Sequence, residues 1–402
     1  MSRPLRVSIV GAGLGGLVAA IALRRAGIEA TLYEQANALG EVGAGIQVGP
    51  NAVKVLRALG LEAGLADFGA QPRQHIGRNW KSGRVLFRSD TQRECLARFG
   101  APFYQVQRSD LHAHLRTALP EGAIQLGRRC VGVEDGPDAA RLRFADGASV
   151  ESDAVVGADG VHSIVRERLL GPGKPRFTGV ICWRGQVEAS RLPPNLIPPD
   201  SLNWMGPGGC IVHYYVRPGR LVNWIAHRTT DIWAEESWSV EGDKQEMLGA
   251  FPGWHPSLLT LLEATERCYK WAIIDREPLP RWSRGRVTLL GDAAHPMLPF
   301  LAQGGAMAME DGYVLADILR RQPGDVPAAL ARYEAARKDR ATRVQAGSRA
   351  RADVCQVVSP LAQLKRDAGY LFNQLFRPGA AVQRADWIYS YDVARLAGEG
   401  SA

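Results

Sequence analysis

The sequence predicts an α/β fold in which a parallel sheet with covering helices is joined to a strand-rich region and followed by further helices. Three observations predict it. The chain opens with a strand, a glycine-rich turn, a helix and a second strand. Eight of the ten tryptophans lie between Trp183 and Trp282, among alternating apolar runs. Helical patterns return after residue 304, and 402 residues suffice for two or three domains.

The opening segment predicts a βαβ unit. Arg6–Val10 is a short apolar strand, Leu14–Ala26 has helical spacing, and Ile28–Glu34 is a second strand. Two strands joined by a helix of about a dozen residues favour parallel pairing.

The middle of the chain predicts antiparallel strands. The runs CIVHYYV (210–216) and LVNWIAH (221–227) alternate apolar and aromatic residues around a Pro-Gly-Arg turn, which is typical of a hairpin. Residues 176–275 therefore form a strand-rich region, and residues 71–105 add strands to it. Beyond it, RVTLLGD (286–292) predicts a strand, and 305–321, 327–354 and 361–376 predict helices.

Composition excludes several classes of protein. Six scattered cysteines without a CxxC pair argue against a disulfide scaffold, a zinc ribbon and a dithiol centre, and they are typical of a reducing cytoplasm. No histidines stand at metal-ligand spacing, so we expect no metal site. The uncharged run 7–23 resembles a signal peptide or a short membrane span, but its glycines are accounted for by a turn, and no other run approaches the ~20 apolar residues that a span needs.

The net charge of +8 is local, because residues 320–351 hold nine Lys/Arg against three Asp/Glu. We interpret this segment as a solvated helix face, and we expect no nucleic-acid binding because a supporting zinc-finger or RNP-like motif is missing. We interpret the amphipathic stretch 361–376 as a packing or dimer helix, and we consider a membrane-surface helix the weaker interpretation.

The first motif that carries chemistry is Gly11-Ala12-Gly13-Leu14-Gly15-Gly16, between a strand and a helix. Gly11 permits the tight turn, Gly13 lets the backbone approach a pyrophosphate, and Gly16 lets the helix pack on the strand. Glu34 ends the second strand, where a carboxylate accepts hydrogen bonds from a ribose diol and repels a ribose phosphate. The motif predicts dinucleotide binding.

Two further motifs follow. DAVVGADGVHSIVR (153–166) predicts a buried strand entering a helix, and Asp159 is either a capping residue or a ligand contact. GDAAHPMLPFLAQGGA (291–306) places Asp292 at a strand end, where it can bond a sugar-like hydroxyl, and the pair Gly304-Gly305 at the start of a helix.

In this order and at these separations, the three motifs resemble those of the class A flavoprotein monooxygenases, the single-component FAD-dependent aromatic hydroxylases. The resemblance runs from about residue 5 to 350. It implies a discontinuous Rossmann-type FAD-binding domain (1–70, 106–175 and 276–350), a substrate-binding domain with a mixed β-sheet (71–105 and 176–275) and a C-terminal helical tail (351–402).

The resemblance also implies an extended FAD. The residues expected to bind it are Gly11, Gly13, Leu14, Gly16, Glu34, Gln35, Arg108, Val131, Asp159, Asp292, Gly304, Gly305 and Ala306. No second GxGxxG unit is present, so NADH or NADPH is expected to bind transiently. In this family FAD is reduced by NAD(P)H, O₂ adds to give a flavin hydroperoxide, and an electron-rich ring takes its terminal oxygen.

Attack by a phenolate is faster, so a base near the substrate hydroxyl is expected. His213 is the candidate base and Tyr214 a substrate contact, although neighbours on a regular strand point to opposite faces. Pro296 matches the family proline beside the oxygen-reacting edge, and Gln303 and Gln47 are candidate substrate contacts. Cys210 stands where related hydroxylases of salicylate, 3-hydroxybenzoate and 6-hydroxynicotinate carry a histidine, a departure that weakens any transfer of substrate identity.

Several short sequence segments of the chain resemble those three hydroxylases most, so the expected substrate is a small phenolic or hydroxy-N-heteroaromatic acid. A substrate carboxylate would want an arginine, and Arg184, Arg217 and Arg228 remain open. Two other functions also remain open, namely the same chemistry on a larger aromatic substrate and a flavin reductase or sensor without hydroxylation. The choice between NADH and NADPH is open as well. A homodimer is expected by analogy only.

Overall fold

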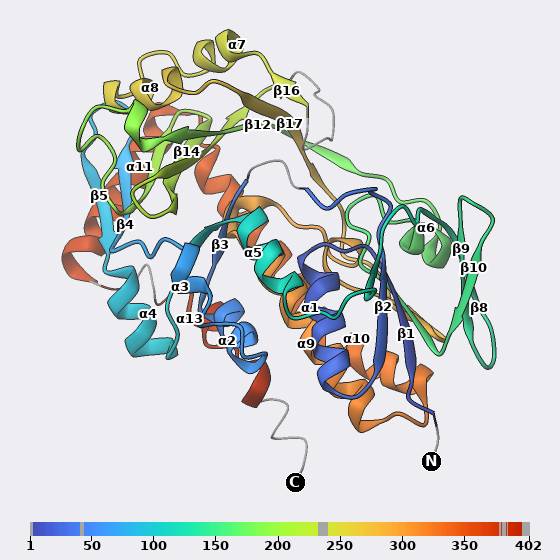
Figure 1. Ribbon diagram of the computed structural model, residues 1–402. Helices are drawn as coiled ribbons and strands as arrows, with labels where there is room; N and C mark the ends of the chain where they lie inside the picture. The colour runs from blue at the N-terminus through green and yellow to red at the C-terminus, as the bar shows by residue number, and fades with distance from the viewer. Residues whose placement is uncertain are drawn as a thin grey trace.

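The computed structural model describes residues 3–40, 44–231, 240–377, 379, 383 and 385–395 (Figure 1). Its strands are β1 (Arg6–Val10), β2 (Glu29–Tyr33), β3 (Gly45–Val48), β4 (His75–Asn79), β5 (Val85–Ser89), β6 (Tyr104–Gln107), β7 (Ile124–Gln125), β8 (Cys130–Asp135), β9 (Ala140–Phe144), β10 (Ser149–Ser152), β11 (Ala154–Gly157), β12 (Arg176–Glu188), β13 (Ser201–Gly206), β14 (Gly209–Arg217), β15 (Leu221–Thr229), β16 (Glu241–Gly242), β17 (Cys268–Asp275), β18 (Ser283–Arg284) and β19 (Val287–Leu289).

The helices follow in the same order. They are α1 (Leu14–Arg25), α2 (Pro50–Ala58), α3 (Leu65–Phe68), α4 (Thr91–Phe99), α5 (Arg108–Arg116), α6 (Ile164–Leu170), α7 (Lys244–Gly249), α8 (Pro256–Glu263), α9 (Gly304–Arg321), α10 (Val326–Cys355), α11 (Pro360–Phe376) and α13 (Asp386–Tyr389), with short 3₁₀ turns η1 (Ala189–Arg191), η2 (Gly291–Ala293) and η3 (Pro299–Leu301).

The predicted βαβ unit forms the centre of a six-stranded sheet. Its strand order is β18-β19-β11-β1-β2-β7, and β1 pairs in parallel with both β2 and β11. Helices α1 and α9 pack against each other beside this sheet, on the right in Figure 1. Because both faces of this sheet are covered, its central strands are continuous apolar runs such as VSIV and AVVG. The α/β class predicted from the sequence is confirmed.

An eight-stranded sheet lies beside the first, at the upper left of Figure 1. The order is β16-β17-β12-β15-β14-β13-β4-β5, and the predicted hairpin is present as β14 and β15. Strands β4 and β5 join through a parallel pairing of β4 with β13. The expectation of strands across 71–105 is wrong for Thr91–Phe99, which is helix α4, capped by the Asp90 side chain.

The two faces of the eight-stranded sheet have different partners. Trp183, Trp204 and Trp224 belong to a core that also includes residues of α7 and α8, such as Met247 and Leu258. The opposite face packs against α10 and the loop before α9, through residues such as Cys182, Trp271, Leu298 and Ala352. This second face turns toward the short ribbon of β3 and β6.

The C-terminal helices are anchored by buried charge. The guanidinium of Arg337 is fully buried in α10 and pairs with Glu310 and Asp311 of α9, at 2.7 and 2.8 Å. Helix α11 rests on β5, and the described part of the predicted tail ends with α13 and Asp392–Arg395. Among the described residues, no helix is both long and apolar enough to cross a membrane.

Candidate cofactor cleft and active site

The glycine-rich turn after β1 has the geometry of an anion cradle. Gly11 has a φ of +100°, and a Cβ there would lie 2.5 Å from the Ala158 carbonyl oxygen. A Cβ on Gly16 would lie 2.1 Å from the Gly11 oxygen, so the helix approaches the strand only without a side chain. Gly13, in contrast, faces open space and stands at the N-cap position just before α1, where no side chain caps the helix. The uncapped N–H groups at this end of α1 fit a pyrophosphate.

Glu34 lies at the mouth of this cradle. One carboxylate oxygen accepts a hydrogen bond from the Ala12 N–H at 2.9 Å, and the other accepts from the Ala36 N–H at 3.0 Å. The carboxylate is thus held in place just after the end of β2, beside the glycine-rich turn. Gln35 follows it and is exposed, and Leu14 is buried as the first residue of α1.

Asp292 and Arg108 face a common recess. Asp292 lies in the turn η2, and its side chain is accessible to solvent at a site that the surrounding protein partly encloses. That enclosure raises the pKa of Asp292, and the charges of His295, Arg108 and Arg166 oppose the rise. Arg108 begins α5, and its backbone N–H donates to the Ala44 carbonyl. The two side chains supply opposite charges to one cleft.

The start of α9 closes the same recess. A Cβ added to Gly304 would be 3.8 Å from Asp292 Oδ1, and one added to Gly305 would be 2.8 Å from Ile46 Cδ1. Ala306 is buried behind them. Ala302 just before them adopts a left-handed φ of +52°, a conformation that is uncommon for a residue with a side chain and is concentrated at functional sites.

Asp159 serves as a helix cap here, one of the two roles open from the sequence. Its carboxylate accepts from the Ser163 hydroxyl and from the Ile164 and Val165 N–H groups that begin α6. Burial raises the pKa of Asp159. Val131 lies nearby on β8, is 40% exposed, and its carbonyl accepts from Arg168.

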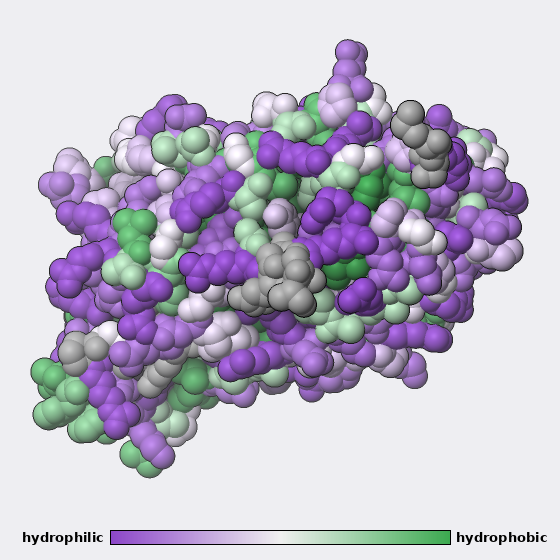
Figure 2. Space-filling model, turned by 90° about the horizontal axis from the view of Figure 1, so that it is seen from below, coloured by the Kyte–Doolittle hydropathy of each residue, from purple (hydrophilic) through white to green (hydrophobic). Residues whose placement is uncertain are grey.

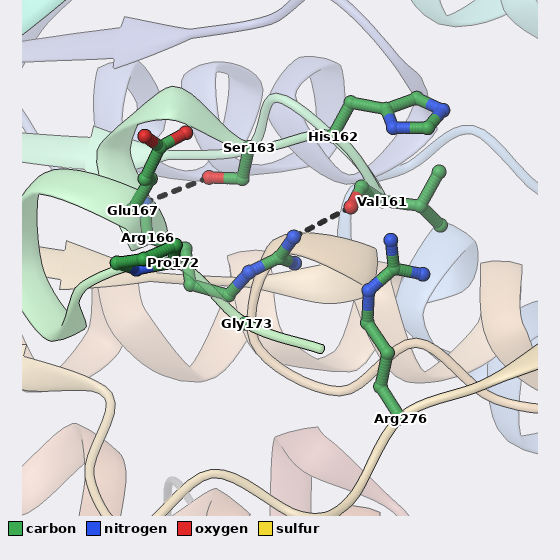
Figure 3. Close-up of a pocket in the computed structure, with 8 residues that line it drawn as sticks. All are labelled: Val161, His162, Ser163, Arg166, Glu167, Pro172, Gly173 and Arg276. Carbon is green, nitrogen blue, oxygen red and sulfur yellow. Dashed lines mark hydrogen bonds between the residues drawn. The ribbon is translucent and has the colours of Figure 1, made fainter. Parts of the chain in front are cut away.

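A pocket of about 300 Å³ opens beside α6 (Figure 3). Arg166 and Arg276 both extend into it, from α6 and from the end of β17. Arg166 also donates to the carbonyls of Asp292 and Ala293, so the pocket adjoins the recess described above. Its walls are completed by Val161, His162, Ser163, Glu167, Pro172 and Gly173.

Strand β14 separates the two candidates that are adjacent in sequence. Tyr214 pairs with Asn223 and is buried on the face toward β3. His213 points to the other face, where its Nε2 accepts from the Trp204 indole at 3.0 Å and burial lowers its pKa to about 3. The structure therefore argues against His213 as a base at the cleft, because the regular strand turns it into the tryptophan core.

Cys210, another candidate substrate contact on β14, is surrounded by protein side chains. Its thiol lies 3.6 Å from His227 Nδ1, and the ring of Phe300 covers His227 at 4.7 Å. Hydrogen bonding to Cys355 of α10 and burial raise the pKa of Cys210. Cys210 is therefore a residue that packs against α10. All six cysteines are free and buried.

A layer of amide side chains, missed from the sequence, lies between β3, β6 and the sheet, and its members Gln107 and Asn223 are buried while Gln186 is half-buried. Gln107 and Gln186 bond each other, and Asn223 Oδ1 accepts from the Gly45 N–H at 2.8 Å. Gln47 follows on the same face of β3 as Gly45, so it turns toward the same layer. The partners come from four segments far apart in sequence, and no local spacing could have indicated them.

Gln303 and Pro296 lie on the loop before α9. The side-chain oxygen of Gln303 accepts from Asn51, which also donates to Glu310, so this oxygen is turned into a buried polar network. The Pro296 carbonyl accepts from Gln345. Next to it, His295 bonds Asp311 at 2.6 Å; burial opposes ionisation of Asp311, yet His295 and Arg337 lower its pKa to about 2.

The three arginines considered for a substrate carboxylate have distinct surroundings. Arg217 forms a two-point pair with Asp110 at 2.8 Å, and Arg228 donates to the Pro207 carbonyl. Arg184 is buried on the cleft-facing side of β12, with its guanidinium 5.4 Å from the ring centres of Tyr269 and Trp271. No group of His, Cys, Asp and Glu in the described part of the chain has the arrangement of a metal site.

The fold and the cleft together define a flavin-dinucleotide-binding protein. The comparisons with known proteins agree: a family model for the FAD binding domain matches residues 5–184 and 261–348. The chain belongs to this FAD-binding family. It is 40% identical over 396 residues to a 3-amino-4-hydroxybenzoate 2-monooxygenase of Streptomyces platensis, covering 98% of this chain and 97% of that one. A 6-hydroxynicotinate 3-monooxygenase of Bordetella bronchiseptica is 42% identical, with 85% and 89% covered.

Solved structures agree with these sequence relatives. Klebsiella pneumoniae HpxO complexed with FAD and uric acid superposes with a TM-score of 0.85 at 29% identity, covering 96% of each chain. A salicylate hydroxylase substrate complex gives 0.82 at 26% identity, with 98% and 97% covered. The protein is an FAD-dependent aromatic monooxygenase of the salicylate, 3-hydroxybenzoate and 6-hydroxynicotinate hydroxylase type.

Proposed function

We propose that this enzyme uses NAD(P)H and O₂ to hydroxylate a small phenolic or hydroxy-N-heteroaromatic acid, in a reducing cytoplasm. The observation that carries the proposal is the position of Tyr214 beside the amide layer, at the place where β3 of the cofactor cleft meets the eight-stranded sheet. A ring held there would lie between the sheet and the cofactor.

The cradle residues Gly11–Gly16 would hold the pyrophosphate of FAD, Glu34 the adenosine ribose, and Asp292 with Arg108 the middle of the molecule. Gln35, Val131, Gly304, Gly305 and Ala306 would complete the contacts. When bound, FAD supplies the transfer of electrons from NAD(P)H and the activation of O₂. Asp159 would act indirectly, by fixing the start of α6.

Tyr214 is the proposed contact to the substrate hydroxyl. Burial raises its pKa, so it stays a phenol and can donate or accept a hydrogen bond at neutral pH. Gln47 would bond a second polar group of the ring. Gln303 would position the α9 loop through Asn51, and buried Pro296 would help to exclude water from the reacting edge.

The pocket beside α6 is the proposed entry site for the reductant. Arg166 and Arg276 place two positive charges next to the Asp292 turn, and such charges suit the phosphates of a nicotinamide dinucleotide. The reductant would leave after each turnover. A homodimer, expected by analogy with related hydroxylases, belongs to the same proposal.

The test is NADH and NADPH oxidation by FAD-loaded enzyme with a panel of salicylate, 3- and 4-hydroxybenzoate, 6-hydroxynicotinate and 3-amino-4-hydroxybenzoate. Oxygen uptake, peroxide and product mass are read together. We expect one acid to stimulate oxidation and to gain one oxygen atom, with or without loss of its carboxylate. If every acid yields only peroxide or no stimulation, the small-acid assignment is wrong, and a larger aromatic substrate or a non-hydroxylating reductase takes its place.

A further inference from the structure

Three polar side chains inside the molecule each have an atom without a hydrogen-bond partner. Gln105, Ser201 and Asn203 are 1, 1 and 5% exposed. Their Nε2, Oγ and Oδ1 atoms form no hydrogen bond with any residue that the structure describes. Polar residues also cover most of the face shown in Figure 2, but those can bond water. Buried polar groups are nearly always paired, so these three call for a partner.

Ser201 and Asn203 lie on the cleft-facing side of β13. Trp204 beside them belongs to the tryptophan core on the other face, and side chains alternate along a strand. The register pairs Asn203 with Val212, and Tyr214 follows two residues later on the same face of β14. Continuing this register places Ser201 opposite Tyr214. Opposite and diagonal neighbours on one face lie about 5 to 8 Å apart, so both groups are neighbours of the proposed substrate contact.

Gln105 approaches the same place from the ribbon of β3 and β6. It lies two residues before Gln107, whose amide bonds Gln186 of the eight-stranded sheet, so both glutamines share the face that looks toward this sheet. Its backbone pairs with Ala70, and five residues later the chain enters β4, the neighbour of β13. Strand β6 itself contacts β14. Gln105 therefore faces the sheet beside β13 and β14.

We propose that Gln105, Ser201 and Asn203 bind the carboxylate of the aromatic substrate, on the β13 side of Tyr214. The inference rests on the function proposed above. A serine hydroxyl donates a hydrogen bond, and each carboxamide can turn its NH₂ group toward an anion. Hydrogen bonds to an ionised acceptor are stronger than those between neutral groups. The substrate ring would then be held at two points, its hydroxyl by Tyr214 and its acid group by the three donors.

Arg184, the buried arginine on the cleft-facing side of the sheet, is turned away from this place. Three strand spacings, about 14 Å, separate its strand β12 from β13. Its guanidinium lies over the rings of Tyr269 and Trp271 on β17, which pairs with the opposite edge of β12. Neutral donors beside Tyr214 are therefore better placed for a substrate carboxylate than this arginine.

The charges around β13 favour an anion. His75 is the register partner of Ser201, and burial together with the charge of Arg351 lowers the pKa of His75 to about 4. A positive charge that disfavours protonation of His75 favours an anion next to it. Asp200, the residue before Ser201, pairs with Arg73 at 3.5 Å, so its negative charge is balanced.

Binding measurements test this role without turnover. Each acid of the panel and its primary carboxamide are titrated into FAD-loaded enzyme, and the change in flavin absorbance gives Kd. We expect at least one acid to bind about 10-fold or more tightly than its amide, which lacks the charge and brings N–H groups that meet other donors. Gln105→Met, Ser201→Ala and Asn203→Leu should each weaken binding of that acid about 10-fold and reduce its preference over the amide.

Ser152→Ala and Asn79→Leu are the matched controls. Ser152 is a buried serine of β10 that donates to the Ala154 carbonyl, and Asn79 at the end of β4 donates to Asp367 of α11. Both variants should keep the Kd values of the unaltered enzyme. Retained flavin absorbance in every variant shows that the cofactor site is intact, so a loss of acid binding is not a loss of fold.

The outcomes separate this inference from the proposed function. If the three variants keep the preference for the acid, or if the unaltered enzyme binds no acid more tightly than its amide, the inference is wrong. Loss of that preference in Arg184→Met or Arg351→Met alone would assign the carboxylate to an arginine instead. If an acid binds through the three groups but gains no oxygen, the inference holds and the proposed hydroxylation fails.

Discussion

The backbone N–H of Gly45 donates to Asn223 Oδ1 at 2.8 Å, across 178 positions of sequence. This bond joins strand β3 of the cofactor cleft to strand β15 of the eight-stranded sheet. Asn223 is also the register partner of Tyr214, and Gln186 donates to it at 3.4 Å. One buried amide therefore fixes the spacing between these two sheets, which we propose to be the flavin side and the substrate side of the cleft.

Replacing Asn223 with alanine should lower the stability of the fold and weaken the binding of FAD. The Gly45 N–H loses its buried acceptor, which costs about 1–3 kcal/mol of unfolding free energy. We expect FAD affinity and product yield per NADH to fall together. Asn203→Ala, which removes another buried asparagine of the same sheet, should lower stability but leave FAD affinity unchanged, as measured by flavin fluorescence and urea unfolding.

Tyr214 and His213 form a matched pair, because they are neighbours on opposite faces of one strand. Tyr214→Phe should lower kcat/KM for the aromatic substrate about 10-fold or more and divert O₂ to peroxide, since it removes a hydrogen bond to the reacting ring. His213→Gln keeps an acceptor for the Trp204 indole and should leave kcat/KM and coupling unchanged. Equal losses in the two variants would contradict this division.

Glu34 should matter for FAD binding and, through its bond from the Ala12 N–H, for the stability of the glycine-rich turn. A charged hydrogen bond to a ribose contributes about 1.5–3 kcal/mol, so Glu34→Ala should weaken FAD binding about 10- to 100-fold. Glu29→Ala changes the exposed carboxylate at the other end of the same strand and serves as the control. Equilibrium dialysis of the apoprotein with FAD measures both.

Arg276 should affect the reductant alone. Arg276→Ser is expected to raise the KM for NADH or NADPH about 10-fold, because a charge that faces the phosphates is lost. The KM for the aromatic acid should stay constant, as should both constants in the control Arg284→Ser, an exposed arginine of β18. A change in FAD affinity instead would place Arg276 in the cofactor site.

Buried histidines predict acid sensitivity. Burial lowers the pKa of His213 to about 3, and the pKa values of His75 and His227 to about 4. Between pH 6.5 and about 4 the unfolded chain binds protons that the native chain does not, so stability falls as the pH falls. In His213→Gln the slope of unfolding free energy against pH should be smaller by about 1.4 kcal/mol per pH unit in that window. Urea unfolding followed by tryptophan fluorescence measures it, and an unchanged slope would refute the assignment.

Much of the architecture was predictable, because its signals are local. The βαβ unit, the β14–β15 hairpin and helices α9, α10 and α11 were expected within one or two residues of their observed ends. Their periodicity and turn residues lie within single segments. Helix α4 was missed, since its short amphipathic pattern follows two strands and was grouped with them.

The site was only partly predictable. The glycine cradle and Glu34 belong to one contiguous motif, and the structure brings them together. The choice between His213 and Tyr214 required knowing which face of β14 meets the cofactor cleft, a fact set by the packing of other strands. The amide layer of Gln107, Gln186 and Asn223 could not be inferred at all, because its members are common polar residues without a characteristic spacing.

The order of strands in the six-stranded sheet has a consequence for biosynthesis. β1 leaves the ribosome first, yet β19 completes the parallel sheet beside β11 only after residue 289, and the α9 end of the cleft follows at residue 304. Every strand of the eight-stranded sheet is synthesised before that point. At about 5–20 residues per second, a nascent chain therefore waits many seconds before it can hold FAD, so the cofactor can act only as a late ligand that secures an almost finished polypeptide.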